Sequence, residues 1–456
     1  MLLGSIFERF AAKSPLTVMA RGLMETALNS EHLDTLFAEH ADEQYTRTLL
    51  FSSVVDLMSL VVCRTRPSIC AAYRALADSL PVSLTSVYNK LDGLEPQVSA
   101  ALVRHSTARL EPVIRELGGQ RQAWLPGYRV KILDGNHLAA TEHRLPETRD
   151  RTSGPLPGMA LVVLDPSLML AIDVFPCENG HAQERSLFPE VLATVCARDV
   201  WLDDRNFCTL GMLFGIARRK AFFVTRQHKG LPWQAENEFH HVGKVEGGEV
   251  WEQTVRLEDE DGSILIARRI KIVLEQATRD GEWELFILTN LPCEEIDALT
   301  VARLYRKRWT IETMFQELAL TLESEIDTLC YPKAALFGFC VGLVAYNLLS
   351  AVKASLAVIH GAEKVEKELS AYYVSDEVSM TYRGMMIAIP EEEWTIFARL
   401  SVAELATVLR DLAGQVRWAY FQKAHRGPKK PRAKRKHNKH QPHVATAKLL
   451  EQRKKE

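Results

Sequence analysis

The sequence has no closely spaced pairs of cysteines. Its eight cysteines lie singly, never as Cys-x-x-Cys, and several stand in apolar runs, so we interpret them as buried thiols rather than disulfides or zinc ligands. The best membrane candidate, 337–352, is shorter than the roughly 20 residues of a spanning helix and contains Asn347. Charges also come too early for a signal peptide. We therefore expect a cytoplasmic protein with no membrane partner.

Net charge is also small, but it is unevenly distributed. The chain carries −2 in total, whereas residues 423–456 hold 13 Lys/Arg against two acidic residues, which leaves −13 for the remainder. Such a basic tail is typical of arms that bind polyanions, with a solvated tail that has no ligand as the alternative. Because the stretch 425–443 has almost no apolar residues to bury, we predict that this tail is disordered in isolation. The basic residues singled out for nucleic-acid contact are Lys429, Lys430, Arg432, Lys434, Arg435 and Lys436.

The length and composition are those of a folded protein with several domains. A chain of 456 residues suggests about three domains, and no repeat of fixed period occurs. Apolar residues at three-to-four spacing predict a helical N-terminal domain over 1–125. Within it, 70–95 reads as a helix, a break at Pro81 and a second helix capped by Ser83. This pattern is compatible with a DNA-binding helix-turn-helix and equally with an ordinary helical pair.

The next part of the chain changes to strands. Residues 126–236 give the order β-β-β-α-β-α-β, which predicts an α/β fold with a mixed sheet covered by helices. Residues 237–292 alternate in short segments separated by Gly-Gly or Asp-Gly, which indicates an all-β insertion. Helices return over 293–422, so the mixed domain is interrupted and resumed before the tail at 423–456.

Two of these strands place aspartates where chemistry could occur. Asp134 follows the run Val-Lys-Ile-Leu and precedes Gly135, and we expect it at the strand end, where an ordinary turn residue is the alternative. The later strand offers Asp203 and Asp204. Neighbouring side chains in a strand point to opposite faces, so only one of the two can share the site. We prefer Asp204, next to Arg205, and keep Asp203 as the alternative.

A third acidic residue lies on a predicted helix. Tyr305, Arg308 and Glu312 have the spacing i, i+3 and i+7, which places all three on one helix face. There Arg308 can present a planar fork to a phosphate, while Glu312 offers a carboxylate to a metal ion. A surface ladder with an i,i+4 ion pair is the alternative. The competing carboxylate of Glu317 should point away from this face.

These motifs resemble a known family. Asp134 in ILDGN, Asp204 in DDRNF, and Tyr305, Arg308 and Glu312 in YRKRWTIE resemble the DDE transposases of bacterial insertion sequences that have a Tyr-Arg-Glu-Lys signature, insertion sequence family four. The resemblance runs from about residue 128 to 350. It implies a ribonuclease H-like catalytic domain that is interrupted by a β-rich insertion before the glutamate.

The resemblance also implies DNA contacts and shows one departure. Arg226 resembles the arginine that contacts the transposon end, and Trp309 stands where relatives also have tryptophan. Trp283 resembles the tryptophan that stacks on a flipped base in some relatives, with a sheet-core tryptophan as the alternative. The signature lysine is missing, because Ala319 occupies its position. Another basic residue must then supply that phosphate contact, or end binding is weakened.

The implied reaction is phosphoryl transfer on double-stranded DNA. Asp134, Asp204 and Glu312 would hold two Mg²⁺ ions, with Mn²⁺ as a substitute, and Asp134 would bridge the pair. The enzyme would cut at terminal inverted repeats and join the freed 3′-hydroxyl to target DNA, as a homodimer. Two rival hypotheses are a transposase-derived regulator that binds DNA without catalysis and a metal nuclease of the same fold that never joins strands.

Overall fold

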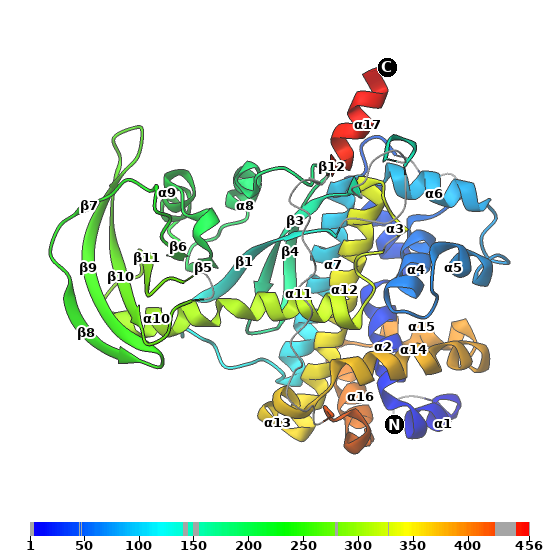
Figure 1. Cartoon of the computed structure of the whole chain (residues 1–456). Helices are drawn as coiled ribbons and strands as arrows, with labels where there is room; N and C mark the ends of the chain where they lie inside the picture. The colour runs from blue at the N-terminus through cyan, green and yellow to red at the C-terminus, as the bar shows by residue number, and fades with distance from the viewer. Residues whose placement is uncertain are drawn as a thin grey trace.

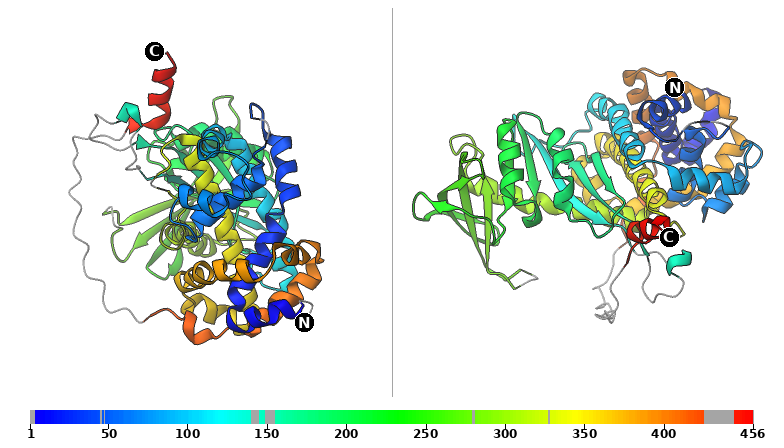
Figure 2. Two further views of the ribbon diagram at one scale, coloured as in Figure 1. Left: turned by 90° about the vertical axis from the view of Figure 1, so that its right-hand side faces the viewer. Right: turned by 90° about the horizontal axis from the view of Figure 1, so that it is seen from above.

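The computed structural model describes residues 4–44, 46, 48–139, 145–148, 155–278, 281–326, 328–424 and 444–455. These residues form a mixed α/β protein with a mostly helical N-terminal region and a central mixed sheet. The far end of the sheet and the helical body lie at opposite ends of the molecule (Figure 1), and the view from above shows the same separation (Figure 2). The predicted mixed sheet and N-terminal helices are therefore confirmed.

Five strands form the part of the sheet that holds two of the predicted acids. They are β1 (Arg129–His137), β3 (Met159–Asp165), β4 (Leu170–Cys177), β5 (Asp199–Asp203) and β6 (Phe222–Arg226). Their order is β4-β3-β1-β5-β6, with β1, β5 and β6 parallel and β3 antiparallel to both of its neighbours. Near-continuous apolar runs suit strands that are covered on both faces. This topology is consistent with a ribonuclease H-like domain.

Further strands extend the same sheet beyond β6. They are β7 (Gln234–Ala235), β8 (His240–Val245), β9 (Gly248–Glu258), β10 (Ile264–Leu274) and β11 (Glu284–Thr289). β11 pairs antiparallel with β6, so these strands continue the central sheet. Turn glycines with positive φ, such as Gly247 and Gly262, close two of the hairpins. The interpretation of 237–292 as an all-β insertion stays a prediction.

Helices cover both faces of the central sheet. On one face, α8 (Phe188–Ala193) and α9 (Leu210–Arg218) share a core with Trp201 of β5 and Phe223 of β6. On the other face, the adjacent Leu202 belongs to the core of the helical body. Successive side chains of a strand alternate between these two cores. Because of this alternation, only one of Asp203 and Asp204 can share a face of the sheet with Leu202.

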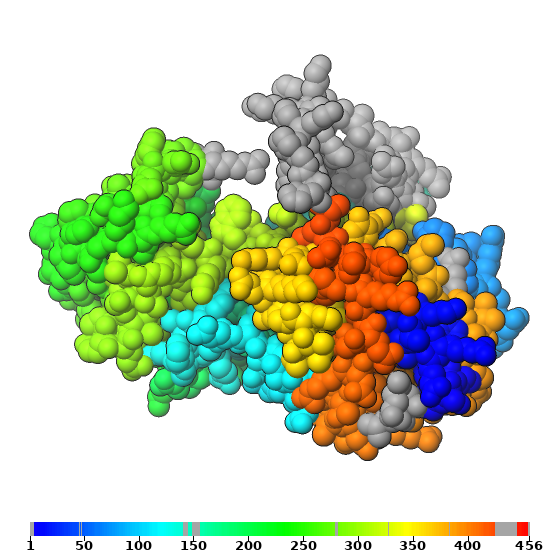
Figure 3. Space-filling model, turned by 90° about the horizontal axis from the view of Figure 1, so that it is seen from below, coloured from blue at the N-terminus to red at the C-terminus, as the bar shows by residue number. Residues whose placement is uncertain are grey.

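The helical body combines the two ends of the sequence. Its helices are α1 (Ser5–Lys13), α2 (Pro15–Ala27), α3 (Ser30–His40), α4 (Phe51–Val62), α5 (Ile69–Ala75), α6 (Leu84–Gly93), α7 (Pro96–Leu117), α12 (Pro332–His360), α13 (Ala362–Glu368), α14 (Ala371–Ala388), α15 (Glu391–Arg399) and α16 (Val402–Gly414). Early and late helices share one core. Seen from below, α1 lies against the late helices, far from the extended strands (Figure 3). The domain boundaries at 125 and 293 stay predictions.

Helix α12 is the centre of this body. Among the described helices it alone is long and apolar enough to cross a membrane, and the apolar window is entirely buried inside the protein. Asn347, at its middle, is fully buried and bonds to β4: its Oδ1 accepts from the Ala171 amide at 2.8 Å, and its Nδ2 donates to the Ala171 carbonyl at 2.9 Å. The polar residue that we noted in this apolar run thus links the helical body to the sheet.

The segment 70–95 forms two helices, α5 and α6. Ser83 caps α6, because its hydroxyl accepts from the Ser86 amide at 3.2 Å. The connection runs from Leu76 to Ser83, which is longer than the turn of three to four residues in a helix-turn-helix. This length favours the ordinary helical pair. DNA binding by this segment stays a prediction.

The C-terminal segment differs in part from the sequence-based expectation. Residues 444–455, predicted to be disordered in isolation, form β12 (Val444–Ala445) and α17 (Thr446–Lys455). β12 pairs with β2 (Pro155–Leu156), and Leu449 is buried against the protein, a contact that composition alone does not reveal. The basic residues singled out in the tail, Lys429, Lys430, Arg432, Lys434, Arg435 and Lys436, lie outside the described residues.

The cysteines follow the prediction only in part. All eight lie within described residues and are free thiols, as expected. Cys208, Cys330 and Cys340 are buried, and three others are half-buried. Cys196 and Cys293 are exposed, however, so the prediction that the thiols are buried is wrong for these two. Both stand in loops between secondary-structure elements, where a small apolar residue carries no information about burial.

Candidate active site

Strand register places Asp134 beside Asp204. Strands β1 and β5 are parallel, and Ile132 pairs with Leu202 at the end of their ladder. Two residues further on, Asp134 and Asp204 stand at the same level and on the same face as that pair. The backbone of Asp204 is still extended, so the alternation holds to this point. The two side chains therefore project from one face at the carboxyl end of β5.

Asp203 belongs to the opposite face. It is level with Thr225 of β6 and is 0% exposed, on the side of Trp201 and the helices α8 and α9. Neither carboxyl oxygen of Asp203 has a hydrogen-bond partner that meets normal geometric limits. Burial raises the pKa of Asp203 well above its ordinary value. The register thus favours Asp204 over Asp203 as the second acid.

The position of Asp134 differs in one respect from the prediction. Strand β1 does not end there but continues to His137, because Asp134 to His137 pair with Val162 to Met159 of β3. The Gly135 amide donates to Oδ1 of Asp134 at 2.9 Å. Asp134 is therefore held within the sheet, and its side chain has a fixed direction.

A continuous helical segment places the third acid over this face. It consists of α10 (Ala298–Arg306), a 3₁₀ turn over Lys307–Trp309 and α11 (Thr310–Thr321). Nη1 of Arg308 donates to Oδ2 of Asp134 at 2.8 Å, and Nη2 donates to Oε1 of Glu312 at 2.9 Å. One guanidinium thus joins two acids that are far apart in sequence. The i,i+4 pair of the alternative exists, but not as a surface ladder, because Arg308 is only 8% exposed.

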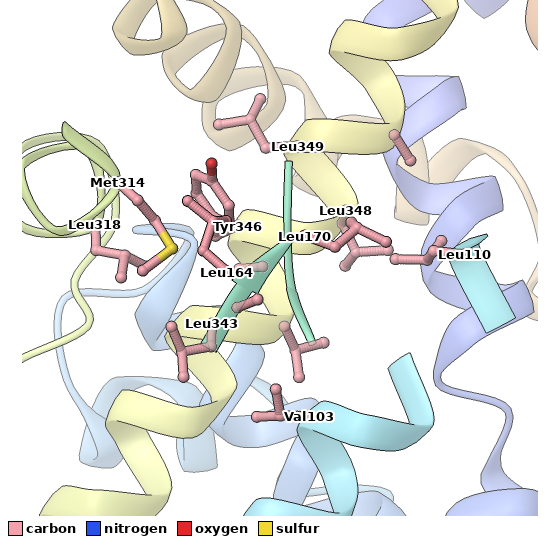
Figure 4. Close-up of a cluster of buried hydrophobic side chains, with 14 of the residues drawn as sticks. Val103, Leu110, Leu164, Leu170, Met314, Leu318, Leu343, Tyr346, Leu348 and Leu349 are labelled. Carbon is pink, nitrogen blue, oxygen red and sulfur yellow. The ribbon is translucent and has the colours of Figure 1, made fainter. Parts of the chain in front are cut away.

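The anchoring of α11 fixes the direction of Glu312. Met314 and Leu318 of α11 lie beside Leu343 and Tyr346 of α12 in the buried cluster (Figure 4). At Gly342 of α12, a Cβ would meet Ser324 at 2.6 Å, so the segment after α11 lies directly on α12. The helical body therefore positions Glu312, whereas the sheet positions Asp134 and Asp204.

The electrostatics of the site reflect burial and crowded charge. Burial raises the pKa of Asp134 to about 6, and nearby Asp204 and Glu312 add to the rise, although Arg308 opposes it. Burial by itself lowers the pKa of Arg308, but Asp134, Tyr305 and Glu312 outweigh it and hold that pKa above its ordinary value. Burial also raises the pKa of Tyr305 to about 12. The acids are thus close enough to repel one another.

The acids suit a hard divalent cation, but their arrangement is not yet a metal site. Carboxylates are the ligands that Mg²⁺ takes in proteins. Within the described part of the chain, however, no three His, Cys, Asp or Glu residues stand in metal-holding geometry. The guanidinium of Arg308 lies between Asp134 and Glu312 instead. The carboxylates therefore suit the divalent cation that the sequence implies. Their present arrangement differs from a metal site because Arg308 lies between two of them.

One acidic neighbour was missed by sequence analysis. Asn206 donates its amide to Oδ1 of Asp204 at 2.6 Å and its side chain to Oε2 of Glu184 at 3.3 Å. The other oxygen of Glu184 lies against Gly135, where a Cβ would come within 2.1 Å of it. Nothing in the sequence marks Glu184, which stands in an unremarkable amphipathic segment. Glu184 can approach the backbone of β1 at this point because Gly135 has no side chain.

The predicted DNA contacts fall into exposed and buried groups. Trp283 is 60% exposed and Trp309 is 63% exposed, so the alternative of a core tryptophan does not describe Trp283. Arg226, at the end of β6, is ion-paired with Glu282, which neighbours Trp283. Tyr305 is 7% exposed and packs in the core. A role of these four residues in DNA contact stays a prediction.

Ala319, at which the resemblance leads us to expect a lysine, lies at the surface. Ala319 is exposed on α11, on the same side of the helix as Glu312. The competing acid Glu317 forms an ion pair with Lys353 of α12 and lies away from Arg308.

Part of the chain that contains these acids matches a known protein family. Residues 125–348, just under half of the chain, match the family model of the transposase DDE domain. The match supports a DDE transposase. Asp134, Asp204 and Glu312 all lie within the matched residues, which begin just before β1 and end inside α12. No curated protein matches the chain.

Proposed function

We propose that this DDE transposase cuts DNA at transposon ends and joins the freed 3′-hydroxyl to target DNA, using Asp134, Asp204 and Glu312. The observation that carries the proposal is the bridge from Arg308 to both Asp134 and Glu312, at 2.8 and 2.9 Å. It brings together acids from a strand and a helix that lie 178 positions apart in sequence. The register of Asp204 beside Asp134 supplies the third acid.

The three carboxylates would hold two Mg²⁺ ions, which supply an activated hydroxyl nucleophile and stabilise the leaving oxygen. The residues of the chain itself do the rest. The sheet fixes the directions of Asp134 and Asp204, and α11 fixes that of Glu312. Arg308 and Arg226 present guanidinium groups suited to phosphate oxygens. In this proposal the fold positions the three acids, and the charged side chains bind the metal ions and the phosphates.

The exposed tryptophans and the basic tail extend the proposal to DNA. Trp283 and Trp309 stand free to stack on bases, which stabilises an extruded base by roughly 1–3 kcal/mol. The basic tail over 423–456 would add backbone affinity that depends on salt. We place the protein in insertion sequence family four despite Ala319. We expect a homodimer on double-stranded DNA, in the cytoplasm and on the nucleoid when bound to DNA.

Strand joining tests the proposal. Purified protein, Mg²⁺ and a labelled duplex of the DNA that flanks the gene should yield cut ends and joined products. Asp134→Asn should abolish both, because it removes a charged ligand and keeps the side-chain shape. Cleavage without joining would favour a metal nuclease, and sequence-specific binding with no Mg²⁺-dependent product would favour a regulator.

A further inference from the structure

Arg308 occupies the position between Asp134 and Glu312 that a cation bridging these two acids would take. Both terminal nitrogens of its guanidinium are used, one on Asp134 and one on Glu312. The other oxygen of Asp134 accepts from the Gly135 amide. A cation that bridges the two acids must therefore displace Arg308. Displacement of a buried, doubly bonded guanidinium without a new partner is costly.

The same guanidinium is positioned to accept a different anion. Its Nε is buried without a hydrogen-bond partner, so one donor of the fork is unsatisfied. The next residue, Trp309, is largely exposed, so Arg308 lies one residue from the surface. A phosphodiester offers two anionic oxygens, which suit a planar fork. DNA can thus take Arg308 away from the acids without leaving its charge unpaired.

We infer that Arg308 is an exchangeable counter-ion, which occupies the acids while DNA is absent and yields them to divalent cations when a phosphate binds it. This inference rests on the proposed function and adds regulation of the same site. Linkage makes the effect reciprocal: DNA increases cation affinity by the factor by which cations increase DNA affinity. The transposase would then assemble its metal site only on its substrate.

The test measures Mn²⁺ binding to the DNA-free protein, from the loss of the electron paramagnetic resonance signal of free Mn²⁺. Arg308→Gln removes the positive charge and should lower the Kd for Mn²⁺ at least tenfold. Arg306→Gln is the matched control, because Arg306 is also ion-paired but to Glu246, away from the acids. It should bind Mn²⁺ as the wild type does. Adding Asp134→Asn to Arg308→Gln should remove the gain.

Two results would overturn the inference: Arg308→Gln binds Mn²⁺ no more tightly than the wild type, or the gain survives in the double variant. If Arg308→Gln does not fold, as judged by its thermal unfolding, Arg308→Lys takes its place. Lysine keeps the charge but lacks the fork that bonds both acids, so at least threefold tighter binding is expected and no gain refutes the idea. Strand joining by the wild type tests the proposed function separately, so the two can fail independently.

Discussion

Ala319→Lys should strengthen DNA binding by restoring a positive charge next to the acids. Ala319 is exposed, seven residues after Glu312 on the same side of α11, so a lysine there projects into solvent beside the site. Alanine to lysine in an exposed helix costs only a few tenths of a kcal/mol, so the fold should not change. One added phosphate contact makes the slope of log K against log[salt] steeper by about 0.9.

That slope sets the expected size of the effect. Between 50 and 200 mM salt, the advantage of Ala319→Lys over the wild type should shrink about 3.5-fold, since a fourfold change in salt is raised to the power of about 0.9. The assay is fluorescence anisotropy with a labelled duplex of the DNA that flanks the gene, at four salt concentrations. Ala319→Gln is the neutral control of similar length. Equal affinities and equal slopes for the two variants would refute the idea that position 319 faces DNA.

Four further substitutions test the packing and the choice of acid. Asn347→Leu removes the side-chain acceptor of the buried Ala171 amide, while the Ala171 carbonyl keeps its bond from Thr107, and it should lower the free energy of unfolding by about 1–3 kcal/mol in urea titrations; an unchanged midpoint would contradict this. Asp204→Asn should reduce strand joining about 100-fold or more, whereas Asp203→Asn should keep most of it, and the reverse order would exchange their roles. Gly22→Ala places a Cβ 2.3 Å from the ring of Phe397 and should lower the free energy of unfolding by about 1–3 kcal/mol. An unchanged midpoint of thermal unfolding would show that the ring moves aside freely.

Local periodicity made part of the site predictable. The spacing of Tyr305, Arg308 and Glu312 places them on one helical side, and the structure contains that helical segment with the Arg308 to Glu312 bond. Strand alternation likewise separates Asp203 from Asp204. Such patterns depend only on bonds between near neighbours, which the sequence determines directly.

Long-range pairing could not be obtained in the same way. The bond from Arg308 to Asp134 joins residues 174 positions apart, and no spacing rule specifies it. Strand β1 continues beyond Asp134 because β3 pairs with it, and residues 444–455 fold because β2 and a buried surface are available to them. In each case the missing information was the partner, which lies elsewhere in the chain.

The candidate site lies where the sheet and the helical body meet, so the distances between its acids depend on how these two parts pack together. The sheet holds Asp134 and Asp204, while α11 holds Glu312 and is itself packed on α12. The distance between the acids therefore depends on how α12 sits on β4, a contact that Asn347 fixes with two hydrogen bonds to one residue of the strand. A small shift at that contact would move Glu312 relative to both aspartates. For the proposed phosphoryl transfer, a buried residue such as Asn347 would therefore matter as well as the carboxylates, because metal-assisted catalysis tolerates little displacement of its ligands.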